Sequence, residues 1–471
     1  AVCVTAGPGA TNALPGLAEA YVDSAPIIIL SGQVEKKFSA DQYKSVYFRT
    51  LGTAEFSITR ILKNITKYFV TITNPLNCLY EIQKALHICK EGRHGPVWVE
   101  VPLDMQSFEI KNRKQLKTYK PKKIYKSDKK TQIKKFIKLL SNSQKPIFMI
   151  GNGVKQSNTK KDLLRLCKKL SIPFVTSRFA NDLYSYDTNE NMGLSGIKGT
   201  LFSKNILDKA DLIIALGCRL APTTINGDPK NFGVNAKLVT INNDINELNN
   251  PLYKFDLKIN MDLKNFFKTY FKFSTKTKNY KEWLKACVEI KKLNPMRGIK
   301  SNSNPINLYR FMYDLCENSK ANSVLVTDAG SNYYIGGQAW KFKKKQIEIA
   351  SSTNAAMGLS VPLSIGAAIA SKKQVLSVTG DGSIELNIQE LKTISHYNLN
   401  IKTFVINNGG YASMKKWQTN YFSGNILDTA ESTGTGTLNF RDVAKAFGIE
   451  YFLIKDVKKI KESLVKIQKN K

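Results

Sequence analysis

Two short polar segments carry residue types that could bind a metal ion and a phosphate. Residues 380–383 (Gly-Asp-Gly-Ser) follow the apolar, β-branched run 375–379, and Asn408 follows the similar run 401–406. The intervening residues 384–397 are long enough for a helix of about three turns, so the stretch predicts a βαβ unit. Because such a crossover returns the chain to a parallel strand, both polar segments should lie at the carboxyl edge of one sheet, where open α/β sheets bind ligands.

This arrangement would bring oxygen ligands together. Asp381 offers a carboxylate and Asn408 an amide carbonyl, which suit a hard cation such as Mg²⁺ that completes its octahedron with phosphate and water. The carbonyl of Gly410, just past Asn408, could be a third ligand. Gly382 and Ser383 would open the helix, so their N–H groups and the helix dipole would point at the anion that shares the metal. A tight turn explains Gly-Asp-Gly taken alone, but the strand-helix-strand pattern up to Asn408 favours the metal site.

At these residues the sequence resembles the thiamine-diphosphate enzymes, which hold their diphosphate and Mg²⁺ with a motif of this kind. Within that superfamily it is similar to the acetolactate synthase group along nearly the whole chain. The resemblance implies an α/β fold of three domains, each a mainly parallel sheet flanked by helices. The thiamine-diphosphate-binding fold is expected in the first and third domains and a Rossmann-like fold in the middle one. The expected bounds are 1–106 for the pyrimidine-binding domain, 131–261 for the middle domain and 305–471 for the diphosphate- and Mg-binding domain.

Composition limits the classes of protein that the chain can belong to. Lys and Arg number 71 against 37 Asp and Glu, a formal net charge of +34. Nucleic-acid binding is one interpretation of such an excess, but the lysines are scattered along helices and loops, which favours a solvated basic surface without a nucleic-acid partner. The resulting field would attract anionic ligands such as diphosphates and 2-keto acids.

The number and spacing of the cysteines and histidines indicate the redox state of the compartment and whether a zinc site is present. The 7 cysteines are widely spaced without a CxxC pair, and the 3 histidines form no metal-ligand cluster. This pattern is typical of reduced thiols in a cytoplasmic protein and not of disulfides or a zinc site. Hydrophobic residues make up 42% of the chain, yet no continuous apolar run is long enough for a membrane span, so a globular protein without a membrane partner is expected.

A glycine loop precedes a helix near the start of the chain. Residues 6–12 (Ala-Gly-Pro-Gly-Ala-Thr-Asn) follow the strand-like residues 1–5, and a plain tight βα connection would explain the glycines. Together with the later run AYVDSAPIIILSGQV, the loop is similar to the pyrimidine-binding domain of acetolactate synthases. In that family the residues matching Pro8 and Asn12 line the aminopyrimidine pocket.

The first domain also departs from the family. The resemblance implies an activating Glu well before the glycine loop, at a position that precedes Ala1, and the chain opens in mid-strand without Met. We therefore expect no such catalytic residue from Ala1 onward and no activity for this stretch by itself. Glu55 lies in the wrong segment for that role. Ala54 stands where the family has an active-site Gln and Leu103 replaces a Lys near the substrate entrance, which leaves the exact substrate open.

The third domain has two further candidate segments. Gly330, Ser331 and Asn332 follow an apolar strand, where their polar groups could meet the diphosphate, although a strand-ending turn is the alternative. Met357 would ordinarily be core filler. It matches a family Met whose side chain sits beneath the cofactor and holds its bent conformation, and Ala355 is expected to contact the cofactor from the same loop.

The middle domain raises the question of a flavin. Gly151 and Gly153 follow an apolar strand, which is a weak dinucleotide signal, and a purely structural domain is the alternative. Acetolactate synthases bind FAD here. The residues matching Gly151, Gly153, Arg219 and Arg93 are kept, but residues 221–223 (Ala-Pro-Thr) replace an Asp-Asp-Arg run. The resemblance therefore allows FAD without requiring it.

The function follows from these matches. Trp417 matches a Trp that lines the acetolactate synthase substrate pocket, with surface packing as the alternative. The implied reaction is decarboxylation of a 2-keto acid followed by carboligation, with pyruvate giving 2-acetolactate and CO₂. Another thiamine-diphosphate lyase or decarboxylase and a non-catalytic relative are the alternatives. The expected partners are a 2-keto acid and further copies of the chain, in a dimer or tetramer with active sites at the subunit interface.

Overall fold

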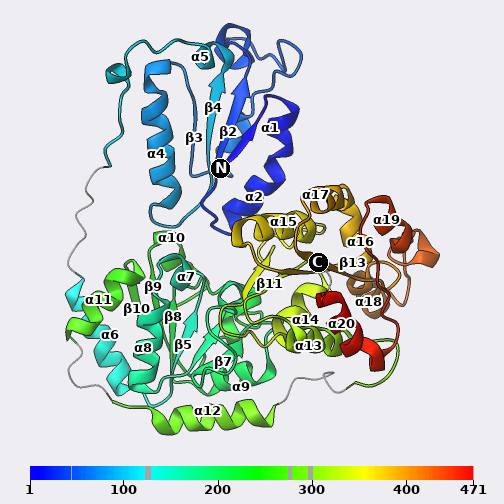
Figure 1. Ribbon diagram of the computed structural model, residues 1–471. Helices are drawn as coiled ribbons and strands as arrows, with labels where there is room; N and C mark the ends of the chain where they lie inside the picture. The colour runs from blue at the N-terminus through cyan, green and yellow to red at the C-terminus, as the bar shows by residue number, and fades with distance from the viewer. Residues whose placement is uncertain (44, 122–128, 274–277, 295–300, 470–471) are drawn as a thin grey trace. The chain divides into compact units, whose positions relative to one another are not determined.

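The computed structural model describes residues 1–43, 45–121, 129–273, 278–294 and 301–469. The chain divides into two compact units, Ala1–Ser127 and Asp128–Lys471. The described residues form three sheets, one in the first unit and two in the second, and every strand pairing within them is parallel (Figure 1). The expected α/β class with three parallel, helix-flanked sheets is thus confirmed, whereas the exact domain bounds stay a prediction.

The first unit has a sheet with helices on both faces. Its strand order is β1-β2-β4-β3, with β1 Val2–Val4, β2 Ile28–Gln33, β4 Val97–Pro102 and β3 Tyr68–Thr71. Successive strand residues point to opposite faces. Ile29 therefore packs with α2 (Leu14–Val22) on one face, while Ile28 packs with α4 (Cys78–Lys90) on the other (Figure 1).

A six-stranded sheet forms the centre of the second unit's first half. The order is β10-β9-β8-β5-β6-β7, with β10 Leu257–Asn260, β9 Lys237–Asn242, β8 Leu212–Leu216, β5 Pro146–Ile150, β6 Phe174–Thr176 and β7 Asn191–Leu194. The sequence did not predict β7, because its residues Asn-Met-Gly-Leu lack a β-branched run. Helix α12 (Lys281–Leu293) docks on this sheet through Trp283, whose indole N–H donates to the carbonyl of Pro146 at 3.0 Å.

The third sheet holds the segments from which the metal site was predicted. Its order is β12-β11-β13-β14, with β12 Ile347–Ala350, β11 Val324–Thr327, β13 Val375–Gly380 and β14 Ile401–Ile406. Gly380 pairs with Ile406, so the chain leaves β13 and β14 side by side at one edge. The predicted βαβ unit is therefore confirmed. Strand β12 was missed, because Glu348 interrupts its short apolar run.

The helix expected over 384–397 is not continuous, and this prediction was wrong. The chain forms α16 (Asp381–Ile384), a 3₁₀ segment η8 (Glu385–Glu390) and α17 (Leu391–His396). Within η8, Asn387 leaves the helical region with φ −140° and ψ 34°. Its side-chain amide donates to the carbonyl of Gly358 at 3.0 Å, so a contact to a distant loop competes with the local helix.

Two properties concern the chain as a whole. Every one of the seven cysteines is a free thiol, and five of them are buried, in agreement with the expected reduced state. Of the helices that the structure describes, none is both long and apolar enough to cross a lipid bilayer.

Candidate active site

The carboxylate of Asp381 connects the ends of β13 and β14. It begins α16 and is only 2% exposed. One oxygen accepts the backbone N–H of Gly382 at 2.9 Å, and the other accepts the N–H groups of Asn408 at 2.9 Å and Gly410 at 3.0 Å. The structure thus brings together the three residues predicted as metal ligands, and their role as ligands remains a prediction.

The turn after β14 is held from two further sides. The ring of Tyr411 packs directly on Gly382, where a Cβ would stand 2.4 Å from the ring carbon Cε1, so only glycine fits there. Lys415, on α18 (Ala412–Tyr421), donates to the carbonyls of Asn408 at 3.1 Å and Gly409 at 2.9 Å. Sequence reasoning missed Lys415, because its lysine resembles many others on a basic chain.

The predicted diphosphate residues at the end of β11 lie beside these turns. Gly330, at φ 70°, precedes α14 (Ser331–Ala339). The hydroxyl of Ser331 is 3.2 Å from that of Ser413 on α18. The amide nitrogen of Asn332 lies 3.5 Å from the position of a Cβ on Gly380. Gly330, Ser331 and Asn332 are therefore neighbours of the Asp381 turn, as the sequence predicted.

Residues 351–358, here called the Met357 loop, are fixed to the same edge of the sheet. The loop follows β12 and contains Ala355, which has a φ of 53°. At its end the N–H of Gly358 donates to the carboxylate of Asp328 at 3.0 Å. A Cβ on Gly358 would stand 3.0 Å from the carbonyl oxygen of Ser383, so the loop is packed closely against α16. Met357 is half-buried within it.

Asp328 is a buried residue beside the site that sequence reasoning missed. It is 3% exposed, and besides Gly358 it accepts the N–H of Ser360 at 3.3 Å and the hydroxyl of Thr379 at 2.9 Å. A single buried carboxylate therefore joins the end of β11, the end of β13 and the Met357 loop. Its place directly after an apolar strand, immediately before Ala-Gly-Ser-Asn, was the available signal.

The donor set at the Asp381 turn fits a hard cation that bridges to a diphosphate. A buried carboxylate is costly unless hydrogen bonds or a cation compensate its charge. Asp381 has three N–H donors, and within the described part of the chain no Lys or Arg forms an ion pair with it. Carboxylate, amide and backbone oxygens are the ligands that Mg²⁺ accepts, and the start of α14 adds a dipole favourable to an anion. The residues present thus fit Mg²⁺ and thiamine diphosphate.

The glycine loop of the first unit is exposed at its predicted cofactor residues. Pro8 and Asn12 lie at the two ends of the short helix α1 (Pro8–Asn12), and both are exposed. Gly7, at φ 58°, packs so closely on the carbonyl of Ala54 that a Cβ would stand 2.4 Å from its oxygen. The position where the family has its active-site Gln is therefore adjacent to the glycine loop. Leu103 is 54% exposed.

Two buried glutamates in the first unit have different environments. Glu55 accepts the N–H groups of Ala40 and Leu51, both at 3.0 Å, which is a loop-closing role. Glu100, on β4, accepts the hydroxyl of Thr71 at 2.8 Å and the amide of Gln33 at 3.2 Å. Burial raises the pKa of Glu100 from 4.5 to about 7, although both of these hydrogen bonds oppose the shift. Sequence reasoning missed this group because a single acid in an apolar strand has no motif.

The predicted flavin glycines of the middle domain serve loop packing. A Cβ on Gly151 would stand 2.2 Å from the carbonyl oxygen of Gly217, and one on Gly153 would stand 2.7 Å from the Cα of Gly217. The turns after β5 and β8 therefore require these glycines without any ligand. Arg219 donates to the hydroxyl of Thr353 at 3.1 Å, so its guanidinium contacts the Met357 loop. These contacts explain the residues without FAD and leave the flavin a proposal.

Trp417 lies in an exposed aromatic group on α18. It is 54% exposed, and its ring centroid is 4.8 Å from that of Tyr421 and 5.9 Å from that of Phe422. This geometry is compatible with surface packing as well as with a wall of a substrate pocket. The pocket role stays a prediction.

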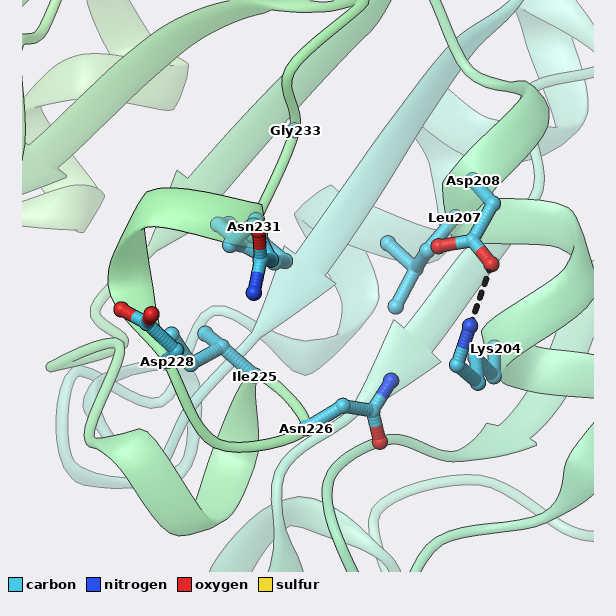
Figure 2. Close-up of a pocket in the computed structure, with 9 residues that line it drawn as sticks. Lys204, Leu207, Asp208, Ile225, Asn226, Asp228, Asn231 and Gly233 are labelled. Carbon is cyan, nitrogen blue, oxygen red and sulfur yellow. Dashed lines mark hydrogen bonds and ion pairs between the residues drawn. The ribbon is translucent and has the colours of Figure 1, made fainter.

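A separate pocket of about 250 Å³ lies in the middle domain between α9 (Leu201–Lys209) and residues 225–233 (Figure 2). Its wall includes Lys204 and Asp208, which form an ion pair at 2.6 Å, and the amide side chains of Asn226 and Asn231 (Figure 2). None of the predicted metal or cofactor residues lines it, so it is distinct from the site at the end of β13.

Family models match three separate parts of the chain. The C-terminal TPP binding domain of thiamine pyrophosphate enzymes matches residues 328–471, the central domain matches 133–269, and the N-terminal TPP binding domain matches 1–49. Thiamine pyrophosphate is another name for thiamine diphosphate. These matches, together with the three parallel sheets, show that the chain is a thiamine-diphosphate enzyme.

Curated relatives narrow the class. A probable acetolactate synthase large subunit of Methanocaldococcus jannaschii is 31% identical over 98% of this chain and 78% of its own length. The acetolactate synthase large subunits of Buchnera aphidicola subsp. Schizaphis graminum and Lactococcus lactis are 29% and 27% identical over 90% and 98% of the chain. The chain belongs to the acetolactate synthase large-subunit family of thiamine-diphosphate enzymes. It is an enzyme of acetolactate synthase-like function.

The environment of Glu100 predicts a pH-dependent stability. Because its pKa is about 7 in the folded protein and 4.5 ordinarily, the folded state binds more protons between these values. The stability that this group contributes is complete below pH 4.5 and is lost as pH rises through about 7. The loss is on the order of 3 kcal/mol. In Glu100→Gln, denaturant unfolding at a series of pH values should show a smaller decrease from pH 5 to pH 8.

A matched variant is Glu109→Gln, which removes an exposed carboxylate from the same unit. It should leave the pH dependence as in the wild type. If Glu100→Gln and the wild type lose stability in parallel over this range, Glu100 does not titrate there.

Proposed function

We propose that the protein converts two molecules of pyruvate into 2-acetolactate and CO₂, using thiamine diphosphate and Mg²⁺. The observation that carries this proposal is the convergence of Asp381, Asn408 and Gly410 beside the diphosphate residues at one sheet edge. One pyruvate loses its carboxylate as CO₂, its two-carbon remainder bonds to the carbonyl carbon of the second pyruvate, and the resulting alkoxide takes up a proton. Thiamine diphosphate, when bound, would supply the positively charged ring that takes up the electron pair left by decarboxylation.

The third sheet's residues would bind and orient the cofactor. Asp381, the side chain of Asn408 and the carbonyl of Gly410 would hold Mg²⁺. Ser331 and Ser383 would meet the diphosphate, with the start of α14 directed at its charge. The N–H groups of Gly382, Asn408 and Gly410 surround the Asp381 carboxylate and exclude bulk water from it, so that it is 2% exposed.

Three further contacts complete the proposal. Met357 would lie beneath the cofactor, Pro8 and Asn12 would line the pyrimidine pocket, and Trp417 would contact the substrate. The relatives' similarity supports this assignment, and so does the exposure of Pro8 and Asn12, which leaves them accessible to a ligand. We further infer a homo-oligomer with active sites between subunits, to be measured by sedimentation.

A different 2-keto acid is the second candidate, favoured by Ala54 and Leu103. These residues replace a family Gln and Lys, and Ala54 directly adjoins the glycine loop. With pyruvate as the sole substrate, the leading proposal predicts 2-acetolactate as the main product, measured by its acid-catalysed conversion to acetoin. Acetaldehyde as the main product would favour a decarboxylase instead, and no CO₂ release from pyruvate would favour another keto acid.

The metal assignment predicts the effect of two substitutions on cofactor affinity. Asn408→Ala removes an oxygen ligand but keeps the backbone N–H that donates to Asp381, so the fold should persist. Asp381→Ala is the second variant. Each of the two should weaken Mg²⁺-dependent thiamine diphosphate binding more than about a hundredfold in calorimetric titration, since even residues behind the metal ligands contribute ten- to hundredfold. Asp208→Asn, an exposed aspartate of the middle domain, is the control. Unchanged affinity in both variants would refute the assignment.

A flavin, where bound, is proposed to be structural, because carboligation involves no net electron transfer. Protein incubated with FAD and freed of excess should keep its flavin absorbance unchanged when pyruvate is added without oxygen. Bleaching on substrate addition would contradict the structural role. Protein that retains no flavin absorbance at all would remove FAD from the proposal.

A further inference from the structure

Arg178 of the middle domain reaches into the third sheet. It follows β6, at the start of the 3₁₀ segment η5 (Arg178–Ala180), and its side chain is 11% exposed. The guanidinium forms an ion pair with Glu348 in the middle of β12 and lies 4.3 Å from the ring centroid of Tyr333 on α14. It also donates to the hydroxyl of Thr327 at the end of β11, at 3.4 Å. One side chain therefore contacts three elements of the diphosphate-binding region.

One glycine in α14 makes room for this side chain. A Cβ on Gly337 would stand 1.5 Å from Nη1 of Arg178, whereas one on the adjacent Gly336 would meet Cγ2 of Thr327 at 3.0 Å and would reach Nη2 only at an ordinary 3.7 Å. Glycine destabilises a helix interior relative to alanine. Gly337 is therefore explained by the guanidinium, which occupies the space of the missing side chain. Asn181 strengthens the contact, because its amide donates to the carbonyl of Gly337 at 3.2 Å.

The buried charges are poorly explained as a device for stability alone. Atoms Nε and Nη1 of Arg178 and Oε2 of Glu348 are buried without a hydrogen-bond partner among the residues that the structure describes. Burial raises the pKa of Glu348 to about 7 in spite of the opposing charge of Arg178. A buried ion pair with incomplete hydrogen bonding often stabilises no more than apolar residues of the same size would. A role in fixing geometry accounts better for its presence.

The elements that Arg178 contacts lead directly into the Met357 loop. Strand β12 continues into this loop. The Arg178 guanidinium stacks on the ring of Tyr333, whose hydroxyl forms a hydrogen bond with the hydroxyl of Ser352 in the loop. Two other middle-domain residues also bind β12 or the loop. Asp182 accepts the N–H of Glu348 at 3.1 Å, and Arg219 donates to Thr353 at 3.1 Å. The first half of the loop is thus held from the middle domain and the second half from Asp328.

We propose that Arg178 is a positioning residue for the Met357 loop, and that the middle domain serves the cofactor site through it, whether or not a flavin is bound. By fixing β12 and Tyr333 against α14, Arg178 holds Met357 in place before thiamine diphosphate arrives. Pre-organisation of this kind raises affinity, because the loop is already ordered when the ligand binds. The inference rests on the proposed position of the cofactor over Met357.

The test compares Arg178→Met, Gly337→Ala and the double variant with the wild type. The first readout is hydrogen exchange of the backbone amides of residues 352–358 in protein without cofactor. The second is the affinity for thiamine diphosphate with Mg²⁺, by calorimetry. Each single variant should speed exchange and weaken affinity about tenfold. The double variant should be no worse than Arg178→Met, because alanine at 337 disturbs the loop only by displacing a guanidinium that is already absent.

Arg310→Met is the matched control. It removes another Arg–carboxylate pair of the second unit, with the buried Asp314 at 2.6 Å, and should leave loop exchange unchanged. Wild-type exchange in Arg178→Met, or equal acceleration in Arg310→Met, would overturn the proposal. Additive effects in the double variant would also overturn it. If Arg178→Met does not fold, the exchange and the affinity of Gly337→Ala alone test the proposal.

Faster exchange with unchanged affinity would show that Arg178 holds the loop but that the loop does not serve the cofactor. This result would overturn the second half of the proposal without affecting the Asp381 site.

Discussion

The candidate active site depends on the hydrogen bonds that the buried carboxylate of Asp381 accepts. Asp381 leaves β13 and accepts N–H groups from its own turn and from the turn after β14. Because a desolvated charge must be compensated, the two turns cannot separate without leaving one oxygen of this carboxylate without a donor. The parallel register that pairs Gly380 with Ile406 is what places these donors within reach. Strand pairing thus brings the two turns together, and the Asp381 carboxylate fixes their geometry at the proposed cation site.

A second carboxylate extends this arrangement to the neighbouring strand. Asp328 ties the end of β11 to Thr379 and to the Met357 loop, and Asn387 interrupts its own helix to hold Gly358. The loop is therefore fixed by polar groups from three places in the chain. From the other direction, Arg178 holds β12 and Tyr333. The middle domain then contributes to the geometry of a site to which it supplies no proposed ligand.

Much of this could be predicted from local patterns. The apolar runs that became β13 and β14 are continuous and β-branched, so their βαβ connection and the proximity of Asp381 to Asn408 followed from the handedness and direction of parallel strands. Gly330, Ser331 and Asn332 were found in the same way. The resemblance to acetolactate synthases, which the comparisons support, named the cofactor that these positions fit.

The rest depends on contacts between residues far apart in sequence. Strand β12 was missed because Glu348 breaks its apolar pattern, and nothing local reveals that this side chain pairs with Arg178. The helix at 384–397 was predicted whole because nothing local reveals that Asn387 bonds to Gly358. Gly151 and Gly153 suggested a dinucleotide, and their close packing on the backbone of Gly217 could not be read from the sequence. In each case a tertiary contact is invisible to a local signal.

The most direct measurement of the central claim is a crystal structure of the protein with thiamine diphosphate and Mn²⁺ in place of Mg²⁺, recorded with anomalous scattering. The account predicts one strong anomalous peak at bonding distance from a carboxylate oxygen of Asp381, the side-chain oxygen of Asn408, the carbonyl oxygen of Gly410 and the diphosphate. A cation bound to the diphosphate away from Asp381, or held by Asp328 instead, would contradict it.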